Sequence, residues 1–477
     1  MQISKRLTIS RFVLWLSLCL MVATAEVALA RDLPPVVSAA LARAGIPGSA
    51  VGIYVQAVDG RAPLATSNPS LALSPASTMK LVTTNAALDL LGPSFTWKTQ
   101  AYANGTLDGD VLRGDLIFKG SGDPKLVTEN FWMFLRQIRA KGIREIRGNL
   151  VLDRSAFEEE ATDPAKFDGD AVKPYNVGPD ALLLNYETLN FKFMPNETSG
   201  TVAVALDPPA TYAVTPPALS GQDCGDWQSR LGAILQPGGV DFTGTYPLSC
   251  GERTWHMQPY QLTHDQYFGA VFRQMWSDLG GSFKGEVNSG VTPDGARLIA
   301  EWESATLPEV IRDINKYSNN VMARQLLLTV AGNALKRPGT PQRGALVIAG
   351  WLAEKGIAAP ELVVENGSGL SRNERISAQT MARMLVAAYR SPVMPEFISS
   401  LPLVGYDGTM RNRLKGRGVA GNAHIKTGRL EDVRAVAGYV LAASGKRYAI
   451  VCIINHRNAD RGLEAQDALL QWVYERG

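Results

Sequence analysis

The chain has few of the residues that bind transition metals, with only four cysteines and four histidines among its 477 residues. The histidines are scattered, and none of them has the spacing of a zinc motif such as His-Glu-x-x-His. A Gly-x-Ser-x-Gly elbow is also missing, which argues against an α/β-hydrolase. We therefore expect no metal and no other cofactor.

The chain also has a small net charge and few long apolar runs. The formal charge is +3, and much of it lies in the first thirty residues, so the rest of the chain is almost neutral. That balance argues against nucleic acid as a partner. A hydrophobic content of 45% and a charged content of 19% are typical of globular proteins, and the length favours two or three domains. After the first thirty residues, no apolar run is long enough to cross a membrane.

The first thirty residues have the pattern of an export signal. Basic residues at positions 5–11 precede an apolar stretch at 12–25, and small residues at 28–30 form a cleavage site before Arg31. Residues 1–30 are therefore predicted to be a signal peptide, cleaved near Ala30. An uncleaved membrane anchor is the alternative, and the short apolar stretch argues against it.

The cysteines predict one disulfide. Cys224 and Cys250 flank a single irregular segment, and in an oxidising compartment they form the natural pair, although spacing alone does not fix the connectivity. Cys452 lies in an apolar run, which is typical of a buried free thiol in a strand.

The pattern of elements changes twice along the chain. Residues 94–262 are rich in Gly and Pro turns and alternating runs, which predicts a β-rich region with one helix at 129–141. Elsewhere, apolar periodicity predicts helices at 33–44, 77–91, 265–280, 379–389 and 463–474, another within 308–331, and strands at 50–56, 423–427, 436–443 and 448–454. The last three strands and the terminal helix indicate an antiparallel sheet packed between helices.

One Ser-x-x-Lys sequence, Ser77 to Lys80, stands at the predicted start of a helix. In helical geometry the lysine lies one turn from the serine on the same face, where it can take the hydroxyl proton. The helix N-terminus adds partial positive charge for an oxyanion. Taken alone, the motif is more typical of an N-cap serine followed by a surface lysine.

Two further sequences strengthen the catalytic interpretation. Lys426-Thr427-Gly428 ends a predicted strand, where the lysine and the threonine hydroxyl can bind a carboxylate and the glycine allows close approach of a substrate. Ser318-x-Asn320 precedes a helix and can supply a hydroxyl for proton relay and an amide that holds the substrate. Each sequence has a purely structural alternative, a turn at the end of a strand in the first case and a helix cap in the second.

In this order the three sequences form the signature of the Ser-Lys group of β-lactamases and penicillin-binding proteins. The whole chain after the signal resembles the low-molecular-mass class C penicillin-binding proteins, the S13 family of D-alanyl-D-alanine carboxypeptidases. Beyond the three motifs, the resemblance is carried by Gly122-Asp123-Pro124, Leu152-Asp153-Arg154-Ser155, Asn366-Gly367-Ser368-Gly369-Leu370-Ser371-Arg372, Gly405-Tyr406-Asp407-Gly408-Thr409-Met410-Arg411-Asn412-Arg413 and Ala437-Gly438-Tyr439-Val440.

The resemblance implies an α/β (α+β) fold whose β-lactamase/transpeptidase-like domain has an antiparallel sheet flanked by helices. That penicillin-binding domain would comprise residues 31–94 and 263–477, split by an inserted β-rich region of two subdomains at 95–262. The predicted signal and the lack of a later apolar span indicate a periplasmic protein, either soluble or loosely associated with the membrane, with no transmembrane anchor after signal cleavage. Its expected partners are peptidoglycan stem peptides, with β-lactam antibiotics as covalent inhibitors.

The family pattern assigns roles to individual residues. Ser77 becomes the acylated nucleophile and Lys80 its general base, while Ser318 and Asn320 relay a proton and hold the substrate. The implied reaction is removal of the terminal D-Ala, with D,D-endopeptidase cleavage of crosslinks at the same site.

Other positions are expected to bind the substrate. Lys426 and Thr427 would hold the terminal carboxylate beside Gly428, and the backbone N–H of Arg429 would complete the oxyanion hole. The family usually has a small hydroxylic residue in place of Arg429, so its side chain departs from the pattern. Two more substrate-binding residues, Arg372 and Asp153, are implied by the same resemblance.

Two rival functions remain on sequence grounds. A serine β-lactamase needs a deacylating glutamate, and the run from Glu187 to Asn190 is one residue shorter than Glu-x-x-Leu-Asn and lies in the wrong part of the chain. A non-catalytic peptidoglycan-binding or sensor protein would not need the intact set of Ser, Lys and Asn residues.

Overall fold

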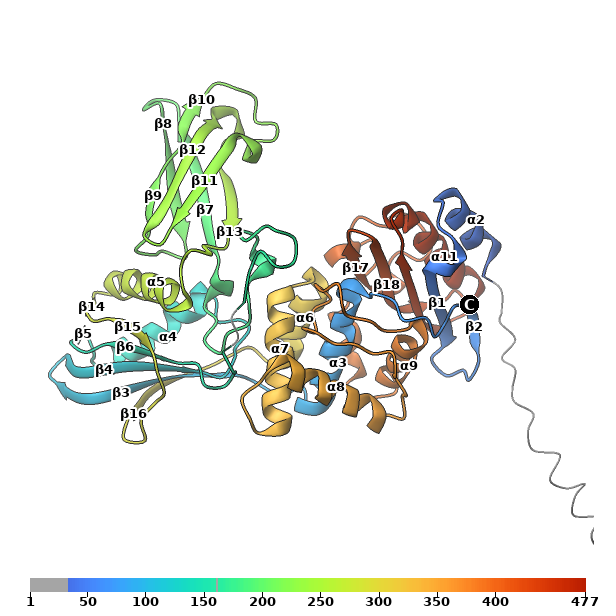
Figure 1. Cartoon of the computed structure of the whole chain (residues 1–477), viewed down its shortest axis with the longest axis horizontal. Helices are drawn as coiled ribbons and strands as arrows, with labels where there is room; N and C mark the ends of the chain where they lie inside the picture. The colour runs from blue at the N-terminus through green and yellow to red at the C-terminus, as the bar shows by residue number, and fades with distance from the viewer. Residues whose placement is uncertain (1–32, 160–161) are drawn as a thin grey trace, which may run out of the picture.

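The computed structural model describes residues 33–159 and 162–477, so the predicted signal peptide lies outside the described residues. Figure 1 shows a main domain at one end of the molecule and a strand-rich insertion at the other. The main domain is built on one sheet in the order β17-β18-β19-β1-β2, and every pair is antiparallel. Its strands are β1 (Val51–Ala57), β2 (Pro63–Ser67), β17 (Ala423–Leu430), β18 (Val433–Leu441) and β19 (Arg447–Asn455).

Both faces of this sheet are buried, which explains the continuous apolar sequence of β19. Its residues alternate between two cores: Ala449, Val451 and Ile453 face one, and Ile450, Cys452 and Ile454 face the other. The second core is covered by α2 (Pro35–Arg43) and α11 (Leu463–Arg476). The first is covered by α3 (Met79–Leu91), α6 (Leu307–Tyr317), α7 (Asn320–Leu335), α8 (Pro341–Glu354), α9 (Ala378–Tyr389) and α10 (Met394–Ser400).

The insertion begins directly after α3 with a mixed sheet. Its strands are β3 (Lys98–Asp108), β4 (Val111–Gly120), β5 (Glu145–Ile146), β6 (Leu150–Asp153), β14 (Ser282–Phe283), β15 (Val287–Ser289) and β16 (Arg297–Glu303). Two helices, α4 (Thr128–Ala140) and α5 (His264–Asp278), pack on this sheet. Phe118 on β4 stands at the centre, within 6 Å of Phe131 and Phe268 by ring centroids.

A second group of strands stands above this sheet in Figure 1. It comprises β7 (Leu189–Asn196), β8 (Thr201–Asp207), β9 (Ala213–Thr215), β10 (Ala218–Ser220), β11 (Leu231–Gln236), β12 (Gly239–Pro247) and β13 (Arg253–Met257). The strands form two small sheets with aromatic side chains between them, among them Phe193 stacked on Tyr246. Cys224 and Cys250 form a disulfide there, which confirms the pairing expected for an oxidising compartment, while Cys452 is a buried free thiol in β19.

The end of the insertion differs from the expected boundary at residue 262. The structure places α5 and β14–β16 with the insertion, because β16 pairs with β3 and the apolar face of α5 packs on Phe118. The inserted region therefore continues to about residue 304. Periodicity predicted the helix at 265–280, but periodicity does not say which sheet a helix covers.

The described part of the chain contains no helix that is both long enough and apolar enough to span a membrane.

Candidate active site

Ser77 lies in a single 3₁₀ turn, Ala76–Thr78, which leads directly into α3. One turn later Lys80 is completely buried, and its Nζ lies 3.1 Å from Ser77 Oγ. The same ammonium nitrogen donates to Asn320 Oδ1 at 2.6 Å and to the Ser368 carbonyl at 2.5 Å. Three segments far apart in sequence therefore meet at one lysine.

The surroundings of Lys80 favour its neutral form. Burial is the largest cause that lowers the pKa of Lys80 well below its ordinary value, and the positive charge of Lys426 lowers this pKa further. The carboxylate of Glu374 acts in the opposite direction but does not outweigh them. A lysine with a lowered pKa is neutral more often near pH 7 and can accept the proton of Ser77.

Ser318 is held in an unusual backbone conformation between α6 and α7. Its φ of 60° and ψ of 37° are left-handed, which is uncommon for a residue other than glycine. The N-cap of α7 is Asn319, whose side chain accepts from the N–H of Met322 at 3.0 Å. The Ser318 hydroxyl is therefore not used as the helix cap, and it accepts from Lys426 Nζ at 2.8 Å.

Lys426 is the second buried lysine of the site. It lies on β17, at the edge of the sheet, and also donates to the carbonyl of Thr427 at 2.8 Å. Burial lowers the pKa of Lys426 to about 7. With Ser77, Lys80 and Asn320, the structure brings together the residues of all three predicted motifs. We call these residues, with Ser318, Lys426 and Thr427, the Ser-Lys cluster.

Two glycines allow neighbouring segments to approach the turn that carries Ser77. A Cβ on Gly428 would lie 2.7 Å from the Pro75 carbonyl oxygen and 3.1 Å from the Ser77 nitrogen. A Cβ on Gly369, whose φ is +79°, would lie 1.9 Å from the Ala76 carbonyl oxygen. Side chains at these positions would push β17 and the loop at 366–370 away from the nucleophile.

Sequence reasoning expected Arg372 of the loop at 366–372 to bind substrate, but it did not foresee that the Ser368 carbonyl of this loop contacts Lys80. This loop is organised by the buried carboxylate of Glu374, which accepts the N–H groups of Glu365, Asn366 and Gly367 at 3.1, 2.9 and 2.8 Å. Burial raises the pKa of Glu374, while these backbone hydrogen bonds act to lower it. The Gly-Ser-Gly run was the available signal, because such runs often bring backbone close to a site.

A second unassigned contact lies beside Thr427. Its hydroxyl is 2.8 Å from the hydroxyl of Thr409, in the short turn Gly408–Met410. That turn is fixed to α6 by an ion pair of 2.6 Å between Lys316 Nζ and Asp407 Oδ2. Asp407 also accepts the N–H of Leu403 at 2.7 Å. Thr409 is thus positioned to orient the Thr427 hydroxyl.

The two arginines expected to bind substrate lie in different surroundings. Arg372 stacks over the ring of Phe167 at 5.4 Å and lines a cavity of about 550 Å³ with Asn366 and Leu370, next to the Ser368 loop. The Arg429 side chain is 73% exposed and pairs with Asp460 at 3.3 Å. The Arg429 guanidinium is therefore directed toward the surface, away from the Ser-Lys cluster.

Asp153 does not join the Ser-Lys cluster. Its buried carboxylate accepts from the N–H and hydroxyl of Ser155 and of Thr292, and Lys119 lies 3.4 Å away. Burial alone would raise its pKa, but the four hydrogen bonds outweigh burial and lower the pKa to about 2. The expectation that Asp153 binds substrate therefore finds no support in these contacts, because every partner lies within the insertion.

No three His, Cys, Asp or Glu side chains within residues 33–159 and 162–477 are grouped so that they could hold a metal ion.

Comparison with known families decides the identity of this site. The model of the D-Ala-D-Ala carboxypeptidase 3 (S13) family matches residues 35–476. The chain belongs to that family. As an S13 member it is a serine D-Ala-D-Ala carboxypeptidase, in agreement with the resemblance seen in its sequence.

Two curated relatives are similar over most of the chain. D-alanyl-D-alanine carboxypeptidase DacB of Haemophilus influenzae is 28% identical over 416 residues, covering 86% of this chain and 86% of the relative. The D-alanyl-D-alanine carboxypeptidase of Actinomadura sp. strain R39 is 29% identical over 419 residues, covering 83% of this chain and 76% of the relative.

Solved structures show the same fold as this S13 member. Penicillin binding protein 4 of Haemophilus influenzae has a TM-score of 0.77 at 25% identity, with 92% of this chain and 99% of that chain covered. The same protein complexed with a β-lactam has a TM-score of 0.72 at 24% identity and the same coverage. A penicillin G acylated predatory endopeptidase of Bdellovibrio bacteriovorus has a TM-score of 0.50 at 15% identity, with 89% and 93% covered.

Proposed function

We propose that this S13 member is an exported peptidoglycan peptidase that works through an acyl-enzyme on Ser77. The observation that carries the proposal is the buried Lys80, whose pKa is lowered and whose Nζ lies 3.1 Å from Ser77 Oγ. A hydroxyl beside a neutral amine is an activated nucleophile. A non-catalytic binding protein has no need for two lysines buried around a serine, which is costly unless they serve chemistry.

The reaction follows from these positions. Lys80 takes the proton of Ser77 as its Oγ attacks the carbonyl of the penultimate D-Ala, and the backbone N–H groups of Ser77 and Arg429 bind the oxyanion. The C–N bond then breaks, and the leaving amine of the terminal D-Ala receives a proton through Ser318. Water hydrolyses the ester in the second half and restores the Ser77 hydroxyl.

Lys426 and Thr427 supply the recognition of the terminal carboxylate. The Lys426 ammonium adds positive charge beside the leaving residue, and the Thr427 hydroxyl donates a hydrogen bond to one oxygen. Thr409 supports this contact, because the Thr427 hydroxyl donates to Thr409 Oγ1 at 2.8 Å and is held in place before substrate binds. Arg372 lines the cavity of about 550 Å³ next to the Ser368 loop. We propose that the rest of the stem peptide binds in this cavity.

The same site is proposed to cleave D-Ala crosslinks and to be acylated by β-lactams. A structural relative is an endopeptidase that penicillin G acylates, and the Haemophilus relative binds a β-lactam. A crosslinked peptide offers the same acyl group with a larger leaving amine, so one nucleophile serves both reactions.

Export to the periplasm is part of the proposal. It is supported by the predicted signal at residues 1–30 and by the disulfide between Cys224 and Cys250, since disulfides persist in oxidising compartments.

A β-lactamase is disfavoured by the position of the run from Glu187 to Asn190. This run leads into β7 of the insertion, and Glu187 lines a cavity that includes no residue of the Ser-Lys cluster. The glutamate therefore has no access to an ester on Ser77. Stable labelling by fluorescent penicillin with slow nitrocefin turnover is expected, whereas rapid nitrocefin turnover would support a β-lactamase.

The deciding experiment is mass spectrometry of muropeptides digested by the wild type and by Ser77→Ala. We expect the wild type to release terminal D-Ala and to split crosslinked dimers, and Ser77→Ala to lose both activities by several orders of magnitude. Ser399→Ala, which alters an exposed serine on α10, is the matched control and should behave as wild type. Release of D-Ala by Ser77→Ala at the wild-type rate would reject the proposal.

A further inference from the structure

A basic surface lies beside the Thr427 hydroxyl. The segment from Gly408 to Asn422 has four basic side chains and no acidic one. Its Thr409 contacts the Thr427 hydroxyl, and two residues span at most about 7 Å, so Arg411 lies close to that contact. Arg429 follows two residues after Thr427 on β17. Side chains two apart in a strand point to the same face, so Arg429 leaves the strand on the face of Thr427.

Two less exposed arginines lie next to these. Arg413 pairs with Asp467 on α11 at 2.5 Å. Arg434 is opposite Arg429 in the register of β17 and β18, and both guanidiniums pair with Asp460. Burial is the main cause that lowers the pKa of Arg434, and the charges of Arg429 and Arg413 lower this pKa further, while Asp460 acts in the opposite direction. These three positive charges therefore lie close enough to repel one another.

We define the basic rim as these four arginines: Arg411, Arg413, Arg429 and Arg434. The three ion pairs above use only two carboxylates, and Arg411 takes part in none of them. The Arg434 side chain is 11% exposed, and its Nη1 is buried without a hydrogen-bond partner within the described residues. The rim therefore has more guanidinium groups than its carboxylates satisfy, and an approaching anion would be attracted to it.

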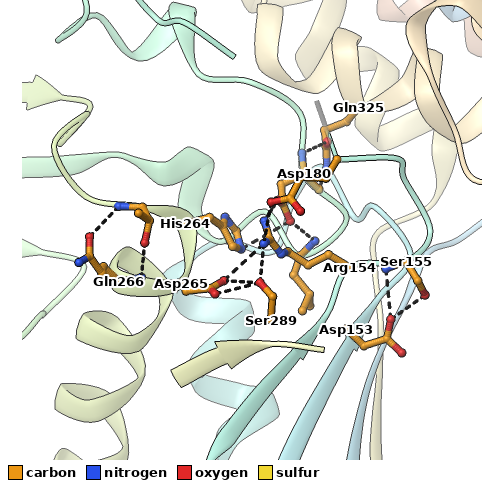
Figure 2. A network of polar contacts seen from close by, with 12 residues as sticks. Asp153, Arg154, Ser155, Asp180, His264, Asp265, Gln266, Ser289 and Gln325 are labelled. Carbon is orange, nitrogen blue, oxygen red and sulfur yellow. Dashed lines mark hydrogen bonds and ion pairs between the residues drawn. The ribbon is translucent and has the colours of Figure 1, made fainter. Parts of the chain in front are cut away.

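Arg154 in the insertion shows the opposite balance of charge. It lies between Asp180 and Asp265 (Figure 2), and Glu159 also pairs with it. Three carboxylates surround one guanidinium there. Such a network has no capacity for another anion, whereas the basic rim has.

Two members of the basic rim are free to reach a ligand. Arg413 and Arg434 hold α11 and the turn at 459–462 against the sheet through their ion pairs. Arg411 is exposed, and the Arg429 side chain is 73% exposed with its partner Asp460 at 3.3 Å. An exposed ion pair of this kind is weak, so Arg429 can exchange Asp460 for another carboxylate.

We propose that Arg429 and Arg411 bind an additional carboxylate of the leaving group and so favour the cleavage of crosslinks. This choice of ligand rests on the proposed function, in which Thr427 binds the carboxylate next to the scissile bond. A leaving D-Ala has only that carboxylate. The leaving strand of a crosslink is a second stem peptide with further carboxylates, which guanidinium groups bind through parallel N–H donors. Because the basic rim adjoins Thr427, it lies beside the path of that strand.

The test compares three substrates with the full-length protein. The first is a stem pentapeptide that releases D-Ala, and the second is a crosslinked dimer of two stem tetrapeptides. The third is the same dimer with the D-Glu and C-terminal carboxylates of its leaving stem converted to amides. All three keep the carboxylate next to the scissile bond. We expect kcat/KM for the charged dimer to exceed that for the amidated dimer by about threefold or more, and high salt to reduce this preference.

Variants assign the preference to the basic rim. Arg411→Gln removes one charge, and Arg429→Ser introduces the small hydroxylic residue that is usual in the family. Each should lower the preference for the charged dimer by about threefold or more. Arg411→Gln should leave D-Ala release at the wild-type level. Arg429→Lys keeps a charge and should retain part of the preference, because an ammonium attracts a carboxylate without binding it at two points.

Arg337→Gln is the matched control, since Arg337 is also an exposed arginine. It follows the far end of α7, a helix of 16 residues that begins at Asn320 in the Ser-Lys cluster. A helix of this length spans about 24 Å, so Arg337 lies far from the leaving group. The preference should be unchanged in this variant. Circular dichroism establishes that each variant is folded.

The outcomes are distinct from those that test Ser77. The proposal is overturned if the wild type cleaves neither dimer or cleaves both equally, if Arg411→Gln and Arg429→Ser both keep the full preference, or if Arg337→Gln loses as much of it. Equal cleavage is the result expected of a rim that only attracts an anionic surface such as a lipid bilayer. In each of these cases D-Ala release continues and the proposed function stands. If the wild type released no D-Ala and cleaved no dimer, the proposed function would fail, and this inference with it.

Discussion

At the scale of single residues, two buried lysines define the Ser-Lys cluster. Lys80 and Lys426 are each removed from solvent, and the pKa of each is lowered mainly for that reason. Their tasks differ. Lys80 must be neutral to accept a proton, whereas Lys426 must be charged to attract a carboxylate. The site is therefore expected to work only at pH values where Lys80 is neutral and Lys426 is still charged.

The pH profile of kcat/KM for D-Ala release should show this limit. On the acidic side of the profile the rate should fall as Lys80 becomes protonated, since only its neutral form accepts the Ser77 proton. Above about 7, the pKa of Lys426, the rate should fall because the neutral amine no longer attracts the substrate carboxylate. In Lys426→Arg the guanidinium stays charged, so the rate should be lower overall but without the alkaline decline. An identical alkaline decline in the two proteins would contradict this assignment.

Asp153 provides a test of a structural role against a substrate role. Its pKa of about 2 in the folded protein is below the ordinary value of 3.8, so the carboxylate stabilises the fold fully above the ordinary pKa. This stabilisation is lost as the pH falls from about 4 to about 2.

Asp153→Asn should therefore lower the free energy of unfolding at pH 7 by roughly 2 kcal/mol, measured by urea denaturation. Penicillin labelling of the folded variant should match the wild type. Asp59→Asn, at an exposed turn, serves as the control. If Asp153→Asn is as stable as the wild type but is labelled weakly by penicillin, Asp153 binds substrate and does not act mainly in the fold.

At the scale of elements, the site depends on what holds β17 beside Ser77. Gly428 lets this strand approach the turn at Pro75, and the turn at 408–410 supports it from the other side. The ion pair between Lys316 and Asp407 ties that turn to α6, whose C-terminal end presents Ser318. One small loop therefore contacts both the strand that carries Lys426 and Thr427 and the helix whose end carries Ser318.

Thr409→Val should expose this dependence, since it removes the hydroxyl but keeps the shape. We expect KM for a pentapeptide with a free carboxylate to rise by about tenfold, because the Thr427 hydroxyl loses its support. The corresponding C-terminal amide, which lacks the carboxylate charge and is expected to be a poor substrate, should be affected much less. Thr409→Ser keeps the hydroxyl and should restore the wild-type KM. Equal losses on acid and amide would indicate general disruption instead of a carboxylate-specific role.

At the scale of the whole molecule, the chain forms separate hydrophobic cores. The main domain has a core on each face of its sheet, and the insertion has its own core, to which α5 contributes. The residues of the Ser-Lys cluster all lie in the main domain, while the disulfide lies in the insertion. Stability and catalysis can therefore be changed independently.

Replacing both Cys224 and Cys250 with serine tests this independence. The disulfide closes a loop with a sequence separation of 26, so its loss should destabilise the insertion by roughly 3–4 kcal/mol in the chain-entropy model. Thermal unfolding followed by tryptophan fluorescence reports this, since Trp227 lies just before β11 and Trp255 lies in β13. Penicillin labelling at low temperature should be unchanged. Loss of labelling in the folded variant would show that the insertion shapes the site.

Much of this protein was determined by local sequence. Local patterns predicted the strand β19, the helix that ends at Gly92 and the pairing of Cys224 with Cys250, and the structure contains all three. The order of the three motifs predicted which residues form the Ser-Lys cluster. These features depend on neighbours along the chain, since helix caps, strand alternation and short motifs are local properties. Family resemblance, carried by the same local motifs, predicted the fold and the activity.

Only the tertiary structure decided which distant side chains meet. The Arg429 guanidinium pairs with Asp460. The carboxylate of Asp153 is buried within the insertion, where it accepts hydrogen bonds from Ser155 and Thr292. In the tertiary structure α5 packs in the core of the insertion, and the Ser368 carbonyl accepts a hydrogen bond from Lys80. The physical reason is the same in each case. The partners of these side chains depend on packing between segments that are far apart in sequence, and local sequence patterns do not contain that information.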